Sequence, residues 1–592
     1  MRIRPLTLED GLYLLFFGLA LVLRLFNLGA APLTDAEANW ALQALDLARG
    51  EQPHIGPQAA YVLMTGLSFA LFNATNFLAR LLPALAGGLL ILLPALLRPL
   101  LGKTNRLRWS GLVLALGLAV DPGLVALSRT AGSLMPALAF SALALALFAR
   151  RKMVWTGIAA GLALLSGPAL LHGMLVMALS WGAYHLVKKR SEALPQDSSE
   201  EITGRLDPVA ASGWRAGGLA LAGTLLFAGL LFLRAPQGLG ALAATLPEYL
   251  LSWVRPSGIP ALRLPAALLV YQPLVVLLAL LAAGRAWQAL RQGEKAAHLA
   301  VGLSLWALVG LLMTMLYPAR QVADLGWVLL PLWALAALEL PLYFANQESR
   351  PVRLAAAGLA ALLCILAVVI WMNVLSIGRY QANLSLYWIV IGGVAVLGII
   401  SVVMVAAGWS LVSARLGVMW AASVVLGLAM LSALWGLTHL RPQAAQELWS
   451  TPPATGLADQ LVETLMTLSR FNTGHDTEIE IVLLDQSPAL RWALRQFPNL
   501  NRTDGLAATD APPIVIASQA QQTPTLAQQY RGQDLIWHIY PGWESVLPPN
   551  VAAWLAFRQA PQATQQIILW ARADVFPGGL EALSSETQPA VP

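Results

Sequence analysis

The chain has 592 residues, of which 57% are hydrophobic and only 11% are charged. Soluble globular proteins carry about 25% charged residues, so this composition excludes a soluble globular protein. The formal net charge of +6 does not indicate nucleic-acid binding, because the basic residues cluster in short loops between apolar segments. A single cysteine, Cys364, lies inside an apolar run, which excludes an intrachain disulfide.

Repeated apolar segments predict membrane-spanning helices, since about 20 apolar residues cross the hydrocarbon core of a bilayer. The first segment lacks the small-residue cleavage site of a signal peptide, so we expect a retained helix. The run 59–72 predicts an interfacial or re-entrant helix, because a full crossing there would invert the charge pattern downstream. We expect about thirteen spans, at roughly residues 11–28, 78–97, 109–127, 133–149, 153–166, 169–187, 216–233, 266–284, 298–316, 325–344, 354–373, 386–406 and 416–438.

Alternate loops between these segments carry lysine and arginine, as in Arg150-Arg151-Lys152. Cytoplasmic loops are enriched in these residues, so we expect the basic loops and the amino terminus, with Arg2 and Arg4, to be cytoplasmic. An odd number of crossings then places the carboxyl-terminal region outside. The sequence therefore predicts a multi-pass protein of the plasma membrane with an extracytoplasmic carboxyl-terminal domain.

The composition changes after Leu440, where glutamine, proline and aspartate become frequent. Periodicity predicts helices at 457–470 and 488–497, and strands at 478–485, 513–517, 534–540 and 565–571. We expect a small α/β domain over residues 441–592, following a transmembrane domain over residues 1–440. Residues 441–592 contain no glycine-rich phosphate loop, metal-ligand spacing or nucleophile elbow, which favours an accessory domain that shapes or covers a site.

Two carboxylates, Asp35 and Glu37, follow the first apolar span at the head of an amphipathic helix. Ionisable groups are rare and costly within a membrane, so acids at its boundary are candidates for chemistry on a substrate that the membrane delivers. The alternative is structural, because Asp35 follows Thr34 and an acid in the first turn of a helix stabilises that helix.

Several short motifs follow one another along residues 24–320 of the chain. They begin with RLFNL at 24–28, TDAEA at 34–38 and Gly50, and continue at His54-Ile-Gly-Pro57 with Tyr61, at 77–87, at 121–129 and at Tyr317-Pro-Ala-Arg320. In this order they resemble the GT-C membrane glycosyltransferases, which include the protein O-mannosyltransferases and the enzymes that put aminoarabinose on lipid A. The resemblance implies a GT-C-like fold with a catalytic module over roughly residues 10–345.

The resemblance also implies sugar transfer on the outer face of the membrane, from a polyprenyl-phosphate or polyprenyl-diphosphate donor to a lipid, glycan or protein acceptor. In the family an acid of the first outer loop, usually within an adjacent Asp-Glu pair, takes the proton of the acceptor hydroxyl. General bases of this kind contribute a factor of about 10² to 10⁴. Here Ala36 splits the pair. We expect Asp35 to be the base and Glu37 its helper, while the reverse assignment and a chain in which neither is catalytic stay open.

Arg129 and Arg320 are candidates for binding the lipid phosphate, because they fall in predicted outer loops, where positive charge is disfavoured. A guanidinium suits a phosphate by its bidentate fork. The alternatives for each are snorkelling toward lipid headgroups or a structural ion pair. Arg80 is expected to be structural and to pair with a first-loop acid or with backbone.

Three further residues are candidate substrate-binding groups: Asp121, His54 and Tyr317. Asp121 precedes Pro122 and is otherwise a helix cap, and His54 is otherwise a hydrogen-bonding loop residue. The family often has a second acid shortly after its equivalent of Arg129, and Gly132 stands there in this chain. No metal ligands are predicted and no cofactor is certain, although a divalent metal is left open.

Two other functions stay open. A flippase or transporter of lipid-linked sugars would carry acids near the bilayer midplane, where this chain has almost none. A catalytically inactive GT-C-like scaffold is favoured by the split acid pair and by the missing second acid. The expected partners are the polyprenyl-phosphate donor, the acceptor and membrane lipids.

Overall fold

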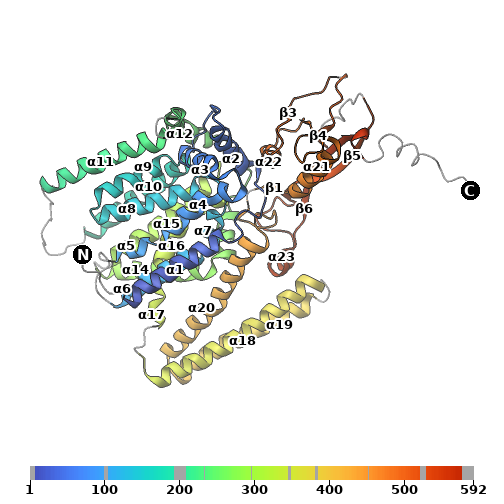
Figure 1. Ribbon diagram of the computed structural model, residues 1–592. Helices are drawn as coiled ribbons and strands as arrows, with labels where there is room; N and C mark the ends of the chain where they lie inside the picture. Colours follow the sequence, from blue (N-terminus) through green and yellow to red (C-terminus); the bar gives the residue numbers. More distant parts are fainter. Residues whose placement is uncertain are drawn as a thin grey trace, which may run out of the picture.

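The computed structural model describes residues 7–98, 105–192, 208–231, 234–294, 297–344, 348–380, 384–450, 452–507, 509–519 and 528–576. A helical bundle is formed by residues up to Leu440, and a sheet with a few helices follows it (Figure 1). Arg2 and Arg4, on which the predicted orientation of the amino terminus rests, lie outside the described residues. The division at residues 440/441 remains a prediction.

The bundle contains helices of very different lengths, from four residues to 31. Their bounds are α1 Leu8–Leu25, α2 Asp35–Ala48, α3 Ala59–Phe72, α4 Asn76–Leu90, α5 Leu93–Leu97, α6 Asn105–Val120, α7 Pro122–Ser128, α8 Leu134–Ala149, α9 Met153–Leu164, α10 Pro168–Glu192, α11 Pro208–Gly229, α12 Gln237–Ser252, α13 Arg263–Tyr271, α14 Pro273–Arg291, α15 His298–Leu316, η2 Val322–Leu325, α16 Gly326–Glu339, α17 Pro341–Phe344, α18 Arg350–Tyr380, α19 Leu384–Gly408, α20 Leu411–Trp435 and the π-helical turn η3 Gly436–Leu440.

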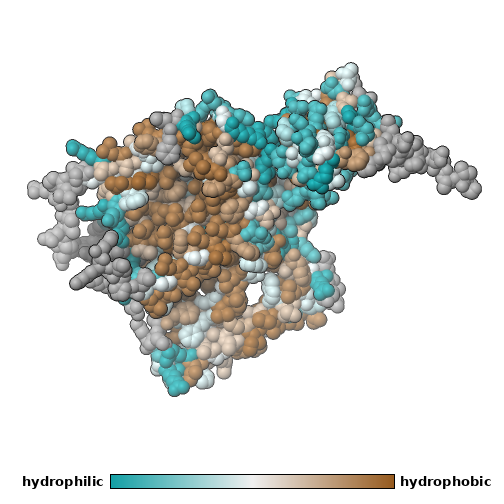
Figure 2. Space-filling model, viewed as in Figure 1, coloured by the Kyte–Doolittle hydropathy of each residue, from teal (hydrophilic) through white to brown (hydrophobic). Residues whose placement is uncertain are grey.

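The bundle is that of a multi-pass membrane protein. In the described part of the chain, eight helices are long and apolar enough to cross a membrane, or nine if α6 and α7 form one bent span. The expected count of about thirteen is therefore not confirmed. The 16 residues of α8 extend only about 24 Å, less than the hydrocarbon core of about 30 Å. The visible face of the bundle is predominantly hydrophobic, whereas the carboxyl-terminal part is hydrophilic (Figure 2).

Helices α18 and α19 lie at the side of the bundle, joined to it through α20 (Figure 1). Gly398 is the only residue of α19 that is buried inside the protein. A helix that is apolar all round and almost entirely unburied by protein is stable only with lipid around it, which agrees with a membrane location.

Two breaks in the helices shape the region beside α2. Asp121 caps α7, with Oδ1 accepting from Leu124 N at 2.8 Å, and Pro122 prevents α6 from continuing, so that α6 and α7 meet at 54°. Gly167 separates α9 from α10 with φ +83°, and a Cβ there would lie 1.9 Å from the Pro57 oxygen. Only glycine allows this close approach of the loop that precedes α3.

The carboxyl-terminal part contains one six-stranded mixed sheet in the order β1-β5-β6-β4-β2-β3. β2 is parallel to β3 and β4, and the other pairs are antiparallel. The expected α/β class is confirmed, although the strand predicted at 478–485 is reduced to three residues. The elements are β1 Ala454–Thr455, α21 Ala458–Thr473, β2 Ile481–Leu483, α22 Pro488–Ala493, β3 Leu500–Arg502, β4 Ile514–Ser518, β5 Tyr530–Pro541, α23 Val551–Phe557, β6 Gln562–Arg572 and η4 Ala573–Val575.

The sheet packs directly on the bundle, since one hydrophobic cluster contains Tyr61 of α3 together with Leu465, Trp492 and Trp537 of the carboxyl-terminal part. Polar contacts surround this cluster: Trp492 Nε1 donates to Asn76 Oδ1 at 2.7 Å. The carboxyl-terminal part is thereby fixed over the amino-terminal end of α2, where the two candidate acids lie.

Candidate functional site

A cavity of about 550 Å³ lies beside the amino-terminal end of α2. Its wall combines the first loop and α2, the segment after α7, the start of α10, the end of α12, the segment before α16 and the chain that follows α20. Three of the predicted site residues, Glu37, Arg129 and Tyr317, line it. Its other polar or charged lining residues are Asn27, Thr34, Asn39, Gln58, Arg80, Thr130, Ser133, His172, Glu248, Ser252, Gln321, Asp324, Thr438, Gln443 and Ser450.

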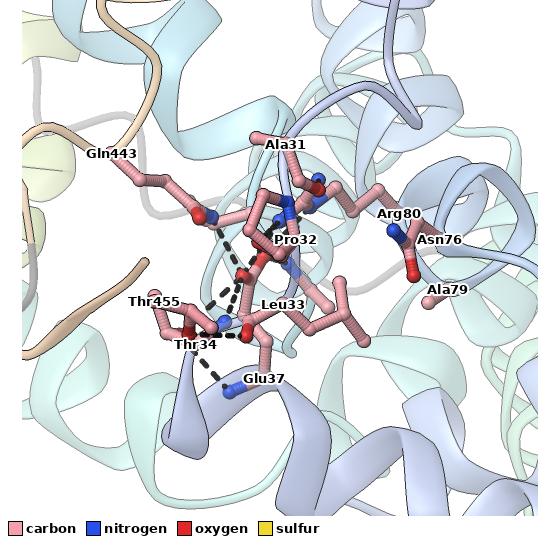
Figure 3. Close-up of polar contacts among 12 residues, drawn as sticks. Ala31, Pro32, Leu33, Thr34, Glu37, Asn76, Ala79, Arg80, Gln443 and Thr455 are labelled. Carbon is pink, nitrogen blue, oxygen red and sulfur yellow. Dashed lines mark hydrogen bonds and ion pairs between the residues drawn. The ribbon is translucent and has the colours of Figure 1, made fainter. Parts of the chain in front are cut away.

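Glu37 is the most heavily bonded group of this wall. Arg80 donates twice, from Nε to Oε1 at 2.9 Å and from Nη2 to Oε2 at 2.8 Å (Figure 3). Ala131 N donates to Oε1 at 2.7 Å, and Gln443 Nε2 donates to Oε2 at 2.6 Å. The expected pairing of Arg80 with a first-loop acid is confirmed, and Glu37 connects four segments that are distant in sequence.

Local sequence explains why Glu37 points inward. Thr34 and Glu37 form a capping box at the start of α2, in which Thr34 N donates to Glu37 Oε2 at 3.1 Å. Glu37 is only 4% exposed. Burial opposes its ionisation, but the Arg80 charge and the hydrogen bonds outweigh burial and hold its pKa below the ordinary value. An ionised carboxylate with both oxygens occupied anchors the site and is a poor proton acceptor.

Asp35 lies outside this wall and contacts the carboxyl-terminal part. Its Oδ1 accepts from Ser487 Oγ at 2.6 Å and from Ala489 N at 3.0 Å, and its Oδ2 lies 2.9 Å from His538 Nε2. The structure thus separates the two acids of the first loop. The residue between them, Ala36, lines the cavity.

We expect the Asp35–His538 contact to make docking of the carboxyl-terminal part pH-dependent. Burial lowers the pKa of His538, but Asp35 and Gln565, with Asp485 near, raise it above 6.5 overall. Burial raises the pKa of Asp35, but bonds from His538 and Ser487 lower it below 3.8 overall. The stability that protonated His538 gives to the docked state is complete below pH 6.5 and is lost as pH rises through the raised pKa of His538. The stability that ionised Asp35 gives to the docked state is complete above pH 3.8 and is lost as pH falls through the lowered pKa of Asp35.

Amide hydrogen exchange of α22 and β5, corrected for intrinsic rates, should therefore increase between about pH 6 and pH 9 in the wild type. In His538→Gln the exchange should be faster than in the wild type at pH 6 and should change little over the same range. An equal pH dependence in both proteins would show that this ion pair does not hold the two parts together.

The two candidate phosphate ligands differ in position. Arg129 lines the cavity and donates from Nη1 and Nη2 to carbonyls at the end of α1, including Phe26 O at 2.7 Å and Asn27 O at 3.2 Å. Arg320 donates to the carbonyls of Ile259, Met315 and Tyr317 and is outside the lining of this cavity. Within the described residues, neither guanidinium forms an ion pair with a carboxylate. Burial and the nearby Arg80 lower the pKa of Arg129 to about 10, so that it is charged at neutral pH.

Two other candidates also lie outside the cavity lining. Asp121 is fully buried, caps α7 and accepts from Trp333 Nε1 at 2.8 Å. This contact agrees with the structural alternative for Asp121. His54 is an exposed residue of the loop before α3.

Sequence reasoning missed several cavity residues, of which His172, Asp324 and Gln443 are the most informative. A signal existed for His172, because a histidine within an otherwise apolar span is a functional candidate by default. No sequence signal pointed to Gln443, because it lies 406 positions from Glu37, in the segment after α20. Its backbone is left-handed, with φ +59°. Strained backbone of this kind concentrates at functional sites.

The described side chains do not favour a metal site, since no three of His, Cys, Asp or Glu among them are grouped to hold an ion. Carboxylates of this cavity are instead engaged with arginine and backbone N–H groups.

No family model matches the chain, and no curated protein matches its sequence. Among solved structures, ArnT from Cupriavidus metallidurans bound to undecaprenyl phosphate matches with a TM-score of 0.53 and 16% identity, over 96% of this chain and 99% of that chain. The chain has the GT-C fold. The apo state of the same ArnT matches with a TM-score of 0.50 and 15% identity, over 95% of this chain and 98% of that chain.

The GT-C fold covers nearly the whole length, including the carboxyl-terminal part, so the match extends beyond the segment 10–345 in which the motifs were found. The resemblance that those motifs indicated is confirmed at the level of the fold. The oligosaccharyltransferase of Archaeoglobus fulgidus in its apo form matches with a TM-score of 0.43 and 12% identity, over 86% of this chain and 69% of that chain.

Proposed function

We propose that this protein is an integral-membrane glycosyltransferase. It moves a sugar from a polyprenyl-phosphate-linked donor to a lipid, glycan or protein acceptor on the outer face of the plasma membrane. The observation that carries the proposal is a cavity in a GT-C fold whose wall holds the charged Arg129 with no carboxylate partner among the described residues. The undecaprenyl phosphate bound to ArnT supports the choice of donor.

Arg129 is the proposed phosphate ligand. Its Nη atoms hold the end of α1, while its Nε–H has no hydrogen-bond partner in the described part of the chain and can donate to a phosphate oxygen. Hydrogen bonds between a guanidinium and a phosphate are charge-assisted and roughly twice as strong as neutral ones. Arg80 adds positive charge to the same wall, although its own donors are used by Glu37 and by backbone carbonyls.

The proposed transfer is a displacement at the anomeric carbon of the donor sugar. The acceptor oxygen forms a bond to that carbon, the bond to the phosphate oxygen breaks, and polyprenyl phosphate leaves with the electron pair. The acceptor hydroxyl loses its proton to a general base. Asp35, the expected base, would have to leave Ser487 and His538 to take this role, whereas Glu248 and Asp324 already line the cavity.

One observation favours a second candidate, a catalytically inactive relative that binds the lipid carrier. The family resemblance places a base in an adjacent Asp-Glu pair, and here Ala36 faces the cavity while Asp35 and Glu37 are engaged elsewhere. This arrangement is expected if the fold has kept its lipid site and lost the base.

One experiment separates the two candidates. Purified protein in nanodiscs is given undecaprenyl phosphate carrying radiolabelled mannose or aminoarabinose, with cell-envelope glycolipid and protein as acceptors. A transferase should label an acceptor in its wild-type form, and Ala36→Asp should change the rate little. An inactive relative should bind undecaprenyl phosphate without transfer, and Ala36→Asp should then raise transfer by about 10² or more, the usual contribution of a general base.

Ala30→Asp is the matched control, because Ala30 is an exposed residue of the loop that precedes α2 and is outside the cavity lining. It should leave transfer and lipid binding as in the parent protein. If the wild type neither transfers sugar nor binds undecaprenyl phosphate, both candidate functions are wrong.

A further inference from the structure

One part of the cavity wall is aromatic. Tyr317, at the end of α15, packs beside both His172 near the start of α10 and Tyr249 of α12, with ring centroids 4.8 Å and 6.0 Å away. Trp253, at the end of α12, meets the Tyr317 ring edge-on at 5.3 Å. Tyr317 also donates its hydroxyl to Ser252, which fixes the orientation of the ring. Of these residues, His172, Ser252 and Tyr317 line the cavity.

Three cavity-lining residues, Ser133, His172 and Trp449, have buried side-chain polar atoms without a hydrogen-bond partner among the described residues, and His172 has two such atoms. Its side chain is 2% exposed, and neither ring nitrogen has a hydrogen-bond partner among the residues that the structure describes. A buried polar group without a partner costs free energy, so each such case in a native protein has a reason. A phenylalanine ring in place of the His172 imidazole would pack against Tyr317 without that cost. The imidazole therefore indicates a ligand that enters the cavity and satisfies its nitrogens.

The polar and aromatic side chains of the wall indicate which kind of ligand fits the cavity. A neutral imidazole offers one N–H donor and one acceptor nitrogen, which match two hydroxyl groups and not a phosphate oxyanion. The Tyr317 ring beside it offers apolar surface to a ligand with C–H groups, and the carboxylates of Glu248 and Asp324 also line the cavity. A polyprenyl tail would leave both nitrogens of the His172 ring unsatisfied.

We propose that His172, with Tyr317 beside it, forms the subsite for the sugar ring of the lipid-linked donor. The phosphate lies toward Arg129, and the sugar attached to it extends toward His172 and places hydroxyl groups on its two ring nitrogens. This inference rests on the proposed function and deepens it, because it assigns the specificity for the sugar to an aromatic and imidazole surface distinct from the phosphate ligand.

The test measures the affinity of detergent-solubilised full-length protein for two probes: undecaprenyl phosphate alone, and undecaprenyl phosphate carrying mannose or aminoarabinose. The wild type should bind a sugar-bearing lipid more tightly than the sugar-free lipid. In His172→Phe, the affinity for that sugar-bearing lipid should fall about 10-fold, the usual effect of losing one or two hydrogen bonds. The affinity for undecaprenyl phosphate alone should change less than about twofold, because Arg129 is intact.

His185→Phe is the matched control, since His185 lies on the same helix, is exposed, and is outside the cavity lining. It should alter neither affinity. Thermal unfolding checks that His172→Phe is folded, and His172→Leu replaces it if it is not. His172→Gln, which keeps a donor and an acceptor, should recover most of the lost affinity.

Two failures are distinguishable. If the wild type binds undecaprenyl phosphate, but the sugar adds no affinity or His172→Phe weakens both probes equally, the sugar subsite is wrong and the proposed function stands. If the wild type binds neither probe, the proposed function itself is wrong, and the subsite with it.

Discussion

Replacing Arg80 by methionine is expected to lower the free energy of unfolding by about 3–5 kcal/mol, the usual cost of removing one partner of a buried ion pair. The substitution leaves the Glu37 carboxylate buried without its cation. It also removes the donors to the carbonyls of Leu28, Ala31 and Pro32, which shape the first loop. Denaturant unfolding in a constant detergent, followed by tryptophan fluorescence, measures the change.

Two further variants separate the effect of leaving a buried charge unpaired from the effect of losing hydrogen bonds. Glu37→Gln removes the negative charge but keeps groups that can hydrogen-bond Arg80 and Ala131, so it should cost less than Arg80→Met. The double variant Arg80→Met/Glu37→Met should cost less than the sum of its single variants, because it leaves neither member of this pair buried without its partner. If Arg80→Met lowers the free energy of unfolding by less than about 1 kcal/mol, the Arg80–Glu37 pair contributes no more than a typical surface ion pair. That result would contradict its role as an anchor of the site.

Replacing Arg129 by methionine is expected to weaken the binding of undecaprenyl phosphate by about 10- to 100-fold, because a hydrogen bond to a charged group contributes about 1.5–3 kcal/mol. Arg320→Met is the matched control. Both arginines donate to three or more backbone carbonyls, so both variants should lose some stability. Only Arg129 lines the cavity, so only its loss should change lipid affinity.

Titration of each variant with undecaprenyl phosphate in detergent, at matched temperature below its unfolding transition, gives the comparison. Arg129→Lys keeps the charge without the planar fork and should fall between the wild type and Arg129→Met. Equal affinities in Arg129→Met and the wild type, or a larger loss in Arg320→Met, would mean that the phosphate binds elsewhere.

The membrane class and the α/β part could be predicted because they depend on composition and local periodicity. Strand β4 at Ile514–Ser518 matches the expected strand at 513–517 within one residue. The number of spans could not be fixed in this way. Helices such as α8 and α9 are apolar but short, and α6 bends into α7 at Asp121-Pro122, so apolar runs and crossings do not correspond one to one.

The site was predicted in part, and helix geometry explains the largest difference. Asp35 and Glu37 are two positions apart, and each residue of an α-helix turns the side-chain direction by about 100°, so the two carboxylates point about 200° apart. Glu37 therefore faces the cavity while Asp35 faces the carboxyl-terminal part. Sequence could not place that part, because His538 and Ser487 lie more than 400 residues from Asp35.

Tyr317 and Arg320 show the same limit at another place. Both belong to one short motif, yet Tyr317 lines the cavity and Arg320 turns toward the backbone of Ile259. A motif locates a segment near a site but does not tell which of its side chains point into the cavity. Packing against distant segments decides that.

The most direct test of the proposed function is a structure of the protein with undecaprenyl phosphate. We predict the phosphate group in the cavity lined by Glu37, Arg129 and Tyr317, with an oxygen about 3 Å from the guanidinium of Arg129. The lipid tail should leave the cavity toward the membrane. A phosphate bound at another surface, with this cavity filled only by water, would contradict the proposed role of Arg129 and of this cavity.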